Sequence, residues 1–349
     1  MRRSEKKKLC ILFAATIIVV AAAWMIFVHA QEDVPAGRVE KENRQFLSDS
    51  SSPVEDTAQV MGTLKLAGKK YEYYNEMETY LFIGMDASGE DSVGGEYQGN
   101  MADFLLLAVL DKTEKKYCFI QLDRDTMAEV RLLARDNTGV ATAQLQLCAA
   151  SWYGGDGEAG CRNVAEAVSN LFGGLAIDGY YSLNMKSIAD INHMVGGVEV
   201  TLEEDIPEGG EEMKKGVTVT LTDEQAYHYL HDRYGVGDET NVSRMKRHRQ
   251  YMKAFLEKAG QLQREDKAFV LRLYQKMEDD AISSISGKDI SRIAKLMQDG
   301  QDMGIREFSG TFRTGQALGD GIDHREFYLD KKSVVKVLTE VYGLVRQSD

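Results

Sequence analysis

The stretch FIQLDRDTM, residues 119–127, leads from an apolar run into an arginine that has an aspartate on each side. Residues two apart in an extended strand project to the same side, so Asp123 and Asp125 are predicted to share one side and Arg124 to point the other way. Paired carboxylates at a strand end suit a bound cation, or a turn that is held by a salt bridge. The stretch therefore predicts a strand that ends in a cluster of charge.

Short apolar runs bounded by turn residues lie on both sides of this stretch and alternate with segments of helical period. The predicted strands are 80–85, 104–110, 117–122, 177–183, 198–202 and 217–221. The alternation predicts an α/β (α+β) fold, with a mixed, partly antiparallel sheet covered by helices on both faces.

Helix signals are clearest in the second half of the chain. Thr222 and Gln225 form a capping box that opens one helix, and a long helix is predicted over 242–263. Two earlier helices are expected to begin near Arg162 and Met185, each with a glycine pair after its last apolar residue. The remaining predictions are helices at 267–277 and 291–297, a strand pair at 305–312 and 325–329, and a final helix from Lys332.

The N-terminus carries a membrane signal. Residues 1–8 hold five bases and one acid, and residues 9–28 hold no charge, which is about the length of a membrane-spanning helix. The basic flank predicts a cytoplasmic tail, a transmembrane anchor at 9–28, and a single-pass protein of the cell membrane whose remaining chain is extracellular. A signal peptide cleaved after Ala30 is the alternative. Residues 29–60 are polar and without period, so they are predicted to form a flexible stalk.

Composition limits the function. The chain has 349 residues, 43% of them hydrophobic, and a net charge of −13. This length and hydrophobicity allow one large domain with a sizeable core. An acidic chain lacks the net basic surface of a nucleic-acid binder, so no nucleic-acid partner is expected.

Two cysteines flank a glycine-rich segment, CAASWYGGDGEAGC, that runs from Cys148 to Cys161. In an oxidising compartment a disulfide between them would close this loop. Two separate, half-buried thiols are the alternative.

Charged residues elsewhere in the chain complete a pattern with Arg124. Asp103 begins an apolar run, and the later stretch HDRYGVGDETNVSRMKRHRQYM holds Arg233, Arg244 and Arg247. Each residue alone has an ordinary explanation as a cap, a turn or a solvated helix face. Together, carboxylates at two strand ends and a cluster of arginines are what a divalent cation and a phosphate group require.

The order of these segments resembles the LytR-CpsA-Psr family, whose domain is also described as a cell envelope-related transcriptional attenuator. FIGMDAS, MADFLLLAVLD, FIQLDRDTM, IDGYYSLNMKSIADINHMVGGVEVTL and SRMKRHRQYMKAFLEK follow one another in the family's order. The resemblance covers about 78–262, which predicts a catalytic domain at 61–262 and a C-terminal extension of helices and strands at 263–349. It implies a membrane-anchored transferase that moves a glycopolymer from a polyprenyl-pyrophosphate carrier to peptidoglycan or a surface protein.

The resemblance also implies roles for single residues. Asp103 and Asp125 match the aspartates that bind Mg²⁺ (or Mn²⁺), and Arg124 lies between them as a third catalytic residue. The residues matched to pyrophosphate binding are Arg124, Arg233, Arg244 and Arg247, with His231 at a position where the family has a further arginine.

Several positions depart from the family pattern. Met101 and Phe104 stand where the family has the arginine and threonine of R-x-D-T, and His231 replaces the first arginine of R-x-R. Each missing charge-assisted contact is expected to cost about 1.5–3 kcal/mol of phosphate binding. His231 replaces an arginine only when it is protonated, and its ordinary pKa is near 6.5. Reduced activity or a diverged substrate would follow.

Two other functions are consistent with the sequence. A non-catalytic surface module that binds lipid-linked glycans or cell-wall material would keep the fold and need no complete site. A membrane-bound regulator of envelope genes is disfavoured, because about eight cytoplasmic residues are too few to fold or to read DNA.

Overall fold

A computed structural model gives the fold of most of the chain. The residues it describes are 59–86, 101–134, 138–153, 157–266, 268–277, 280–285, 289, 292–293, 296 and 299–347. The predicted tail, anchor and nearly all of the predicted stalk lie outside these ranges. Within them, no helix has both the length and the hydropathy that crossing a membrane needs.

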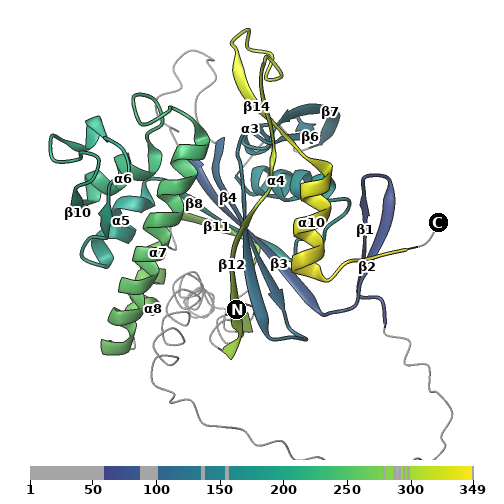
Figure 1. Ribbon diagram of the computed structural model, residues 1–349, viewed down its shortest axis with the longest axis horizontal. Coiled ribbons are helices and arrows are strands. Elements are labelled where there is room, and N and C mark those ends of the chain that lie inside the picture. The colour runs from purple at the N-terminus through teal and green to yellow at the C-terminus, as the bar shows by residue number, and fades with distance from the viewer. Residues whose placement is uncertain are drawn as a thin grey trace, which may run out of the picture.

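A six-stranded sheet forms the centre of the molecule (Figure 1). Its order is β11 (Ala281–Ser283), β8 (Gly179–Asn184), β3 (Met77–Asp86), β4 (Met101–Asp111), β5 (Lys116–Leu122) and β12 (Gln301–Glu307). β4 pairs antiparallel with β3 and β5, whereas β8 and β12 pair in parallel with β3 and β5. The predicted mixed, partly antiparallel sheet is confirmed. β4 is buried along nearly its whole length, which explains its continuous apolar sequence.

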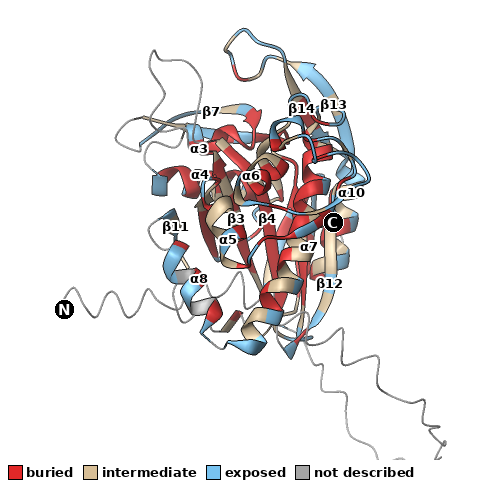
Figure 2. Ribbon diagram, turned by 90° about the vertical axis from the view of Figure 1, so that its left-hand side faces the viewer, coloured by how far each residue is buried: buried red, intermediate tan, exposed pale blue. Residues whose placement is uncertain are grey.

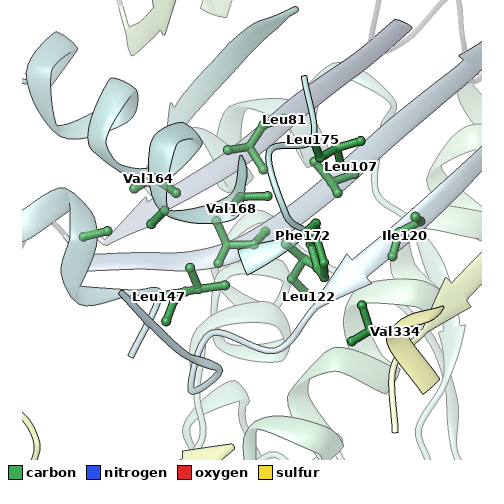
Figure 3. Packing of buried hydrophobic residues seen from close by; sticks show 14 of the residues in the cluster. Leu81, Leu107, Ile120, Leu122, Leu147, Val164, Val168, Phe172, Leu175 and Val334 are labelled. Carbon is green, nitrogen blue, oxygen red and sulfur yellow. The ribbon is translucent and has the colours of Figure 1, made fainter. Parts of the chain in front are cut away.

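Helices cover both faces of this sheet, as predicted. One face carries α3 (Ala149–Trp152), α4 (Gly157–Leu171) and α10 (Lys331–Tyr342), and the other carries α5 (Ser187–Met194), α6 (Asp223–His231), α7 (Asn241–Glu265) and α8 (Phe269–Met277). Successive strand residues point to opposite faces of the sheet, so each face has its own hydrophobic core. In the first core, on the α4 and α10 side, Leu81 and Leu107 pack with Val168 and Phe172 (Figure 3). In the second core, on the α7 side, Phe82 packs against the buried residues. Buried residues concentrate between these layers (Figure 2).

Smaller sheets surround the central one. They consist of β1 (Gly62–Leu66), β2 (Lys69–Tyr73) and β15 (Val345–Arg346); β6 (Met127–Leu133) and β7 (Gly139–Gln146); β9 (Glu199–Thr201) and β10 (Thr218–Thr220); and β13 (Gly310–Gly315) and β14 (His324–Leu329). A short 3₁₀ helix, η1, covers Pro207–Gly209. The strands predicted at 198–202 and 217–221 are present, but they pair with each other outside the central sheet.

The C-terminal strands pair differently from the prediction. Ile305, predicted to pair with the 325–329 segment, lies in β12 and joins the central sheet beside Phe119. The hairpin partner of β14 is β13, which starts at Gly310. The predicted pair of 305–312 with 325–329 is therefore wrong in its first strand, because a local alternation pattern does not identify the partner strand.

Helix ends follow the sequence closely. The capping box at Thr222 is confirmed, since its hydroxyl accepts from the Gln225 amide at 3.2 Å and the Gln225 side chain accepts from the Thr222 amide at 3.0 Å. Thr240 caps α7 by accepting from Ser243 N at 3.2 Å. This cap fixes the first turn of α7, and with it the direction in which the helix presents its arginines.

Candidate active site

Neighbouring strand and helix ends bring the predicted residues together. Asp86 ends β3 opposite Met101, the first residue of β4, so Asp103 lies two residues into that strand. Arg124 and Asp125 lie in the turn between β5 and β6, where Thr126 N donates to the Asp123 carbonyl at 3.0 Å. The end of α6 and the start of α7 reach the same place.

Asp103 is the centre of a buried ion cluster. It is 6% exposed, and its two carboxylate oxygens accept hydrogen bonds from different guanidinium groups. Arg124 Nη1 donates to Oδ1, and Arg244 Nη1 donates to Oδ2 at 2.8 Å. Burial opposes ionisation, but the charges of Arg124 and Arg244 outweigh it and lower the pKa of Asp103 to about 2. Asp103 is therefore an ionised anchor for two arginines, and both of its oxygens are occupied.

The Arg124 guanidinium lies between two carboxylates. Besides its bond to Asp103, its Nε is 3.5 Å from Asp125 Oδ1, and its Nη2 is 3.0 Å from the sulfur atoms of both Met101 and Cys148. The prediction that Arg124 points away from its neighbours is therefore wrong for Asp125, because the chain turns after Leu122 and leaves the extended conformation.

Asp123 and Asp125 have different surroundings in this turn. Asp123 Oδ1 accepts from the Asp125 amide at 2.9 Å and from Asn241 Nδ2 at 2.8 Å, so this side chain holds the turn to α7. Burial, with the nearby Asp125 charge, raises the pKa of Asp123 to about 6. Asp125 Oδ2 is buried and has no hydrogen-bond partner among the residues that the structure describes. Asp125 thus keeps an oxygen available for a ligand.

The predicted arginines of α7 divide between two tasks. Arg244 is 3% exposed, and besides Asp103 it donates to Asn241 Oδ1 through Nη2 at 2.8 Å. Arg247 Nε donates to the Tyr229 carbonyl at 2.7 Å, and its other nitrogens donate to Glu204 and to the Asp232 carbonyl. Arg247 therefore fixes the end of α6, and its printed contacts do not include Asp103.

Arg233 lies in the loop after α6 and is half-buried. It donates to the Tyr234 hydroxyl and stacks over that ring at 4.6 Å. Together with Arg124 and Asp125 it lines one pocket, which places its charge beside the predicted phosphate site.

His231 carries a charge that the sequence did not indicate. Its Nδ1 is 3.1 Å from Asp232 Oδ1, its Nε2 is 3.9 Å from Asp86 Oδ1, and its ring stacks on Tyr227 at 4.8 Å. Hydrogen bonding to Asp232 and Asp86 outweighs burial and raises the pKa of His231 to about 9. The expectation that His231 is neutral above pH 7 is therefore corrected.

An NMR titration of the His231 ring is expected to give a pKa near 9. Because the folded pKa exceeds the unfolded value of 6.5, the stabilising contribution of His231 is complete below about pH 6.5 and is lost as the pH rises through 9. Asp232→Asn should lower the measured pKa, since it removes the strongest partner of the imidazolium. A pKa at or below 6.5 in the parent protein would contradict this environment.

The predicted disulfide is not present in the structure, in which Cys148 and Cys161 are both buried, free thiols. Cys148 Sγ contacts Arg124 Nη2 at 3.0 Å, and burial raises its pKa to about 11. Cys161 lies inside α4, packed in the first core. The structure corresponds to the alternative of two separate thiols, except that both are fully buried.

An apolar groove opens next to the ion cluster on the α7 side of the sheet. Its volume is about 1120 Å³, including its open mouth, and Phe82, Phe104, Leu183, Ile188, Met252 and Phe255 are among its lining residues. Phe104 follows Asp103 in β4, and His248, another lining residue, is one helical turn beyond Arg244. One end of the apolar groove thus borders the ion cluster.

His248 lies between the apolar groove and the ion cluster and is uncharged. Its Nε2 is 2.8 Å from the Leu230 carbonyl, and its ring meets the Phe104 ring edge to face at 5.4 Å. Burial and the charge of Arg244 lower its pKa to about 3, so the ring is neutral at physiological pH.

The sequence did not indicate several residues of this region. Asn241 links Asp123 to Arg244, and its only signal was its place just before the arginines of a predicted helix. Gln146 and Tyr234 line the pocket of Arg124 and Asp125, and no spacing or motif singled them out. Met101, identified only as a departure, contacts Arg124 through its sulfur.

Comparisons with known proteins identify the family and the fold. The model of the LytR_cpsA_psr family matches residues 43–337. Among solved structures, the protein gbs0355 from Streptococcus agalactiae is 20% identical with a TM-score of 0.58, covering 78% of this chain and 90% of its own. TagV of B. subtilis is 21% identical with a TM-score of 0.53, covering 77% and 98%. TagT bound to LIIa-WTA is 18% identical with a TM-score of 0.52, covering 76% and 91%.

These structural likenesses establish a shared fold, and no curated protein sequence matched the chain. The family model spans most of the chain, including the central sheet, the ion cluster and the helices on both faces. The chain belongs to the LytR_cpsA_psr family.

Proposed function

We propose that this protein is a membrane-anchored phosphotransferase of cell-wall biogenesis, extracellular beyond its N-terminal anchor. It transfers a glycopolymer from a polyprenyl-pyrophosphate carrier to peptidoglycan or a surface protein. The observation that carries the proposal is an apolar groove that borders a buried cluster of arginines and carboxylates. Family membership supports it, and so does the fold shared with TagT, which was solved with LIIa-WTA bound.

The groove and the cluster match the two halves of such a donor. A polyprenyl chain is apolar and would lie against Phe104, Leu183 and Met252, away from water. The pyrophosphate at its end would then meet the guanidinium groups of Arg124 and Arg244, with Arg233 on the pocket side. Arginine suits this position because its planar group binds phosphate oxygens bidentately.

The reaction follows from this placement. The oxygen of an acceptor hydroxyl attacks the phosphorus nearest the glycan, a new O–P bond forms, and the bond to the second phosphate breaks so that polyprenyl phosphate leaves. The hydroxyl proton passes to Asp125, whose Oδ2 has no partner among the described residues. Asp103 serves as the anchor of Arg124 and Arg244, because both of its oxygens are already engaged.

A divalent cation fits this site under one condition. Both carboxylates must turn from Arg124 before they can be ligands, because Asp103 Oδ1 accepts from its Nη1 and Asp125 Oδ1 lies 3.5 Å from its Nε, and no group of three metal-ligating side chains occurs within the described ranges. Mg²⁺ commonly uses one or two carboxylates together with phosphate oxygens. We propose that Asp103 and Asp125 hold Mg²⁺ (or Mn²⁺) when the pyrophosphate is bound, where the ion supplies neutralisation of phosphate charge.

Calorimetric titration with Mg²⁺ in the presence of a soluble pyrophosphate is expected to show binding to the parent protein and none to Asp125→Asn, which loses a hard anionic ligand. Asp205→Asn is the matched control, because Asp205 is half-exposed and pairs with Lys214 on the surface. Equal binding by the parent and Asp125→Asn would remove Asp125 from the metal site.

The function is tested by incubating the purified extracellular domain with a polyprenyl-pyrophosphate saccharide, peptidoglycan and Mg²⁺, with a chelator in a parallel sample. Formation of saccharide-linked peptidoglycan together with an equal amount of polyprenyl phosphate is the expected result. Asp125→Asn should reduce the rate by about 100-fold or more, which is typical of losing a general base.

A non-catalytic module that binds lipid-linked glycans is the second candidate. Two observations favour it. Both carboxylate oxygens of Asp103 are already paired with arginines. Met101 and His231 stand at positions where the family has arginine. Tight binding of the donor with no transfer to any acceptor, with Mg²⁺ present, would establish this alternative instead.

A further inference from the structure

A polar pocket lies beside the ion cluster and shares Arg124 with it. Its volume is about 650 Å³, including its open mouth. Arg124 and Asp125 line it from the β5–β6 turn, Gln146 from the end of β7, and His324 and Arg325 from β14. The polar pocket therefore combines the predicted catalytic residues with a C-terminal hairpin, β13–β14, for which the sequence indicated no role.

The hairpin is attached firmly to the catalytic turn. Phe327 N donates to the Asp125 carbonyl at 2.8 Å, and Thr126 and Phe327 form a parallel bridge. Gln146 Nε2 donates to the Arg325 carbonyl at 3.2 Å, which orients the amide of Gln146. The β13–β14 hairpin is thus one wall of the polar pocket, held by backbone contacts to the residues it faces.

Three buried polar atoms of this pocket lack hydrogen-bond partners. They are Asp125 Oδ2, Gln146 Oε1 and Arg124 Nε, and none has a partner within the part of the chain that the structure describes. Gln146 is 2% exposed and lines the polar pocket, so its unpaired oxygen lies at the pocket wall and not in open solvent. An unpaired buried polar atom destabilises the protein, and a ligand that supplies the missing hydrogen bond would remove that cost.

The three atoms select the chemistry of the ligand. Two of them accept hydrogen bonds and the third donates one, so neither a bare cation nor an anion satisfies the set. Hydroxyl groups satisfy it, because each hydroxyl both donates and accepts. Charged side chains of both signs line the rest of the pocket, including Arg233 and Glu239, so it has no strong preference for an ionic ligand.

An aromatic ring at the rim adds a second feature. Tyr234 is 76% exposed and lines the same pocket, with Arg233 stacked on one face of its ring. A flat, exposed aromatic surface beside hydroxyl-binding groups suits a sugar ring, whose faces carry C–H groups and whose edges carry hydroxyls.

We propose that the polar pocket binds a saccharide, with its hydroxyls paired to Asp125, Gln146 and Arg124 and its ring against Tyr234, and that the β13–β14 hairpin forms the wall that selects it. This inference rests on the proposed transferase function, which it extends to the saccharide. The sugar belongs either to the acceptor or to the first residue of the donor glycan, since both present neighbouring hydroxyls.

The test measures binding of three probes to the extracellular domain: a soluble peptidoglycan disaccharide, a short-chain prenyl-pyrophosphate saccharide, and the same prenyl pyrophosphate without sugar. Gln146→Leu and Tyr234→Ala are each expected to raise the Kd of at least one saccharide probe by about 10-fold, as expected for losing a hydrogen bond or a ring contact. Neither should change the Kd of the sugar-free probe. Gln144→Leu is the matched control, because Gln144 is an exposed residue of the same strand.

A rise in Kd that is confined to the disaccharide probe identifies the acceptor as the source of the sugar. A rise in Kd that is confined to the sugar-bearing prenyl pyrophosphate identifies the donor. Absence of saccharide binding by the parent, or unchanged Kd values in both variants, overturns the inference. Tyr234 is exposed, so the Tyr234→Ala result does not depend on correct core packing.

The same variants separate this inference from the proposed function. If the parent transfers glycan and Gln146→Leu leaves the KM for acceptor and donor unchanged, the saccharide site is wrong and the transferase stands. If saccharide binding depends on Gln146 but the parent transfers nothing, the site stands and the transferase proposal fails.

Discussion

Asp103→Asn is expected to lower the free energy of unfolding by about 3–5 kcal/mol, the range found when one partner of a buried ion pair is removed. The substitution leaves Arg124 and Arg244 beside each other without the carboxylate that neutralises them. Both guanidinium groups are largely buried, with side-chain exposures of 14% and 3%, so solvent compensates little of the loss. Urea unfolding at pH 7 provides the measurement.

Asp111→Asn supplies the matched control. Asp111 lies at the other end of the same strand and is also buried, but it accepts from Asn75 at 2.7 Å and from the Glu114 amide at 2.8 Å. Its nearest cation, Lys116, is 3.9 Å away and partly exposed. Asp111→Asn should therefore cost clearly less than Asp103→Asn. Similar losses for the two variants would show that the ion cluster does not hold the site together.

The stabilisation by Asp103 should also depend on pH. Its folded pKa of about 2 lies below the ordinary value of 3.8, so its contribution is present above about pH 4 and is lost as the pH falls toward 2. The difference in unfolding free energy between the parent and Asp103→Asn should shrink over that interval.

Met252→Glu is expected to weaken binding of a polyprenyl-pyrophosphate donor by about 100-fold or more. Met252 lines the apolar groove on α7 and is half-buried, so the new carboxylate would either be desolvated by the lipid or exclude it. Because α7 already borders solvent at this position, the protein itself should remain folded. Titration with a fluorescent short-chain polyprenyl pyrophosphate gives the Kd.

Two control variants test whether the loss of binding is specific to a charge in the groove. Met252→Leu keeps the apolar volume and should bind like the parent protein. Met303→Glu makes the same change in β12, at an exposed position that does not line the groove, and should also bind like the parent. A normal Kd for Met252→Glu would mean that the lipid lies elsewhere.

Local patterns in the sequence predicted much of the fold. The central strands and the start of α6 follow from apolar runs and a capping box, both of which depend on neighbouring residues. The grouping of Asp103 with Arg124 and Arg244 was expected from the family resemblance, and the structure places all three in contact. The roles given to these residues, and their metal, stay predictions.

The remaining features depend on contacts between distant segments. The raised pKa of His231 depends partly on Asp86, which is distant in the sequence. The two carboxylate oxygens of Asp103 pair with arginines from two separate elements. The loss of stability expected for Asp103→Asn likewise follows only from its two buried arginine partners. The wall formed by β14 could not be predicted, because no local signal states which strand or turn a hairpin will contact.

Photo-crosslinking with a polyprenyl pyrophosphate that carries a photoreactive group in its lipid tail tests the central claim most directly. Mass spectrometry of the labelled protein is expected to place the label on residues of the apolar groove, such as Phe104, Leu183 and Met252, with competition by unlabelled donor. Arg244→Ala should reduce the labelling, because it removes a cation from the end of the groove. Label found mainly outside the groove, or unaffected by unlabelled donor, would contradict the claim that the groove and the ion cluster together form a site for a lipid-linked pyrophosphate.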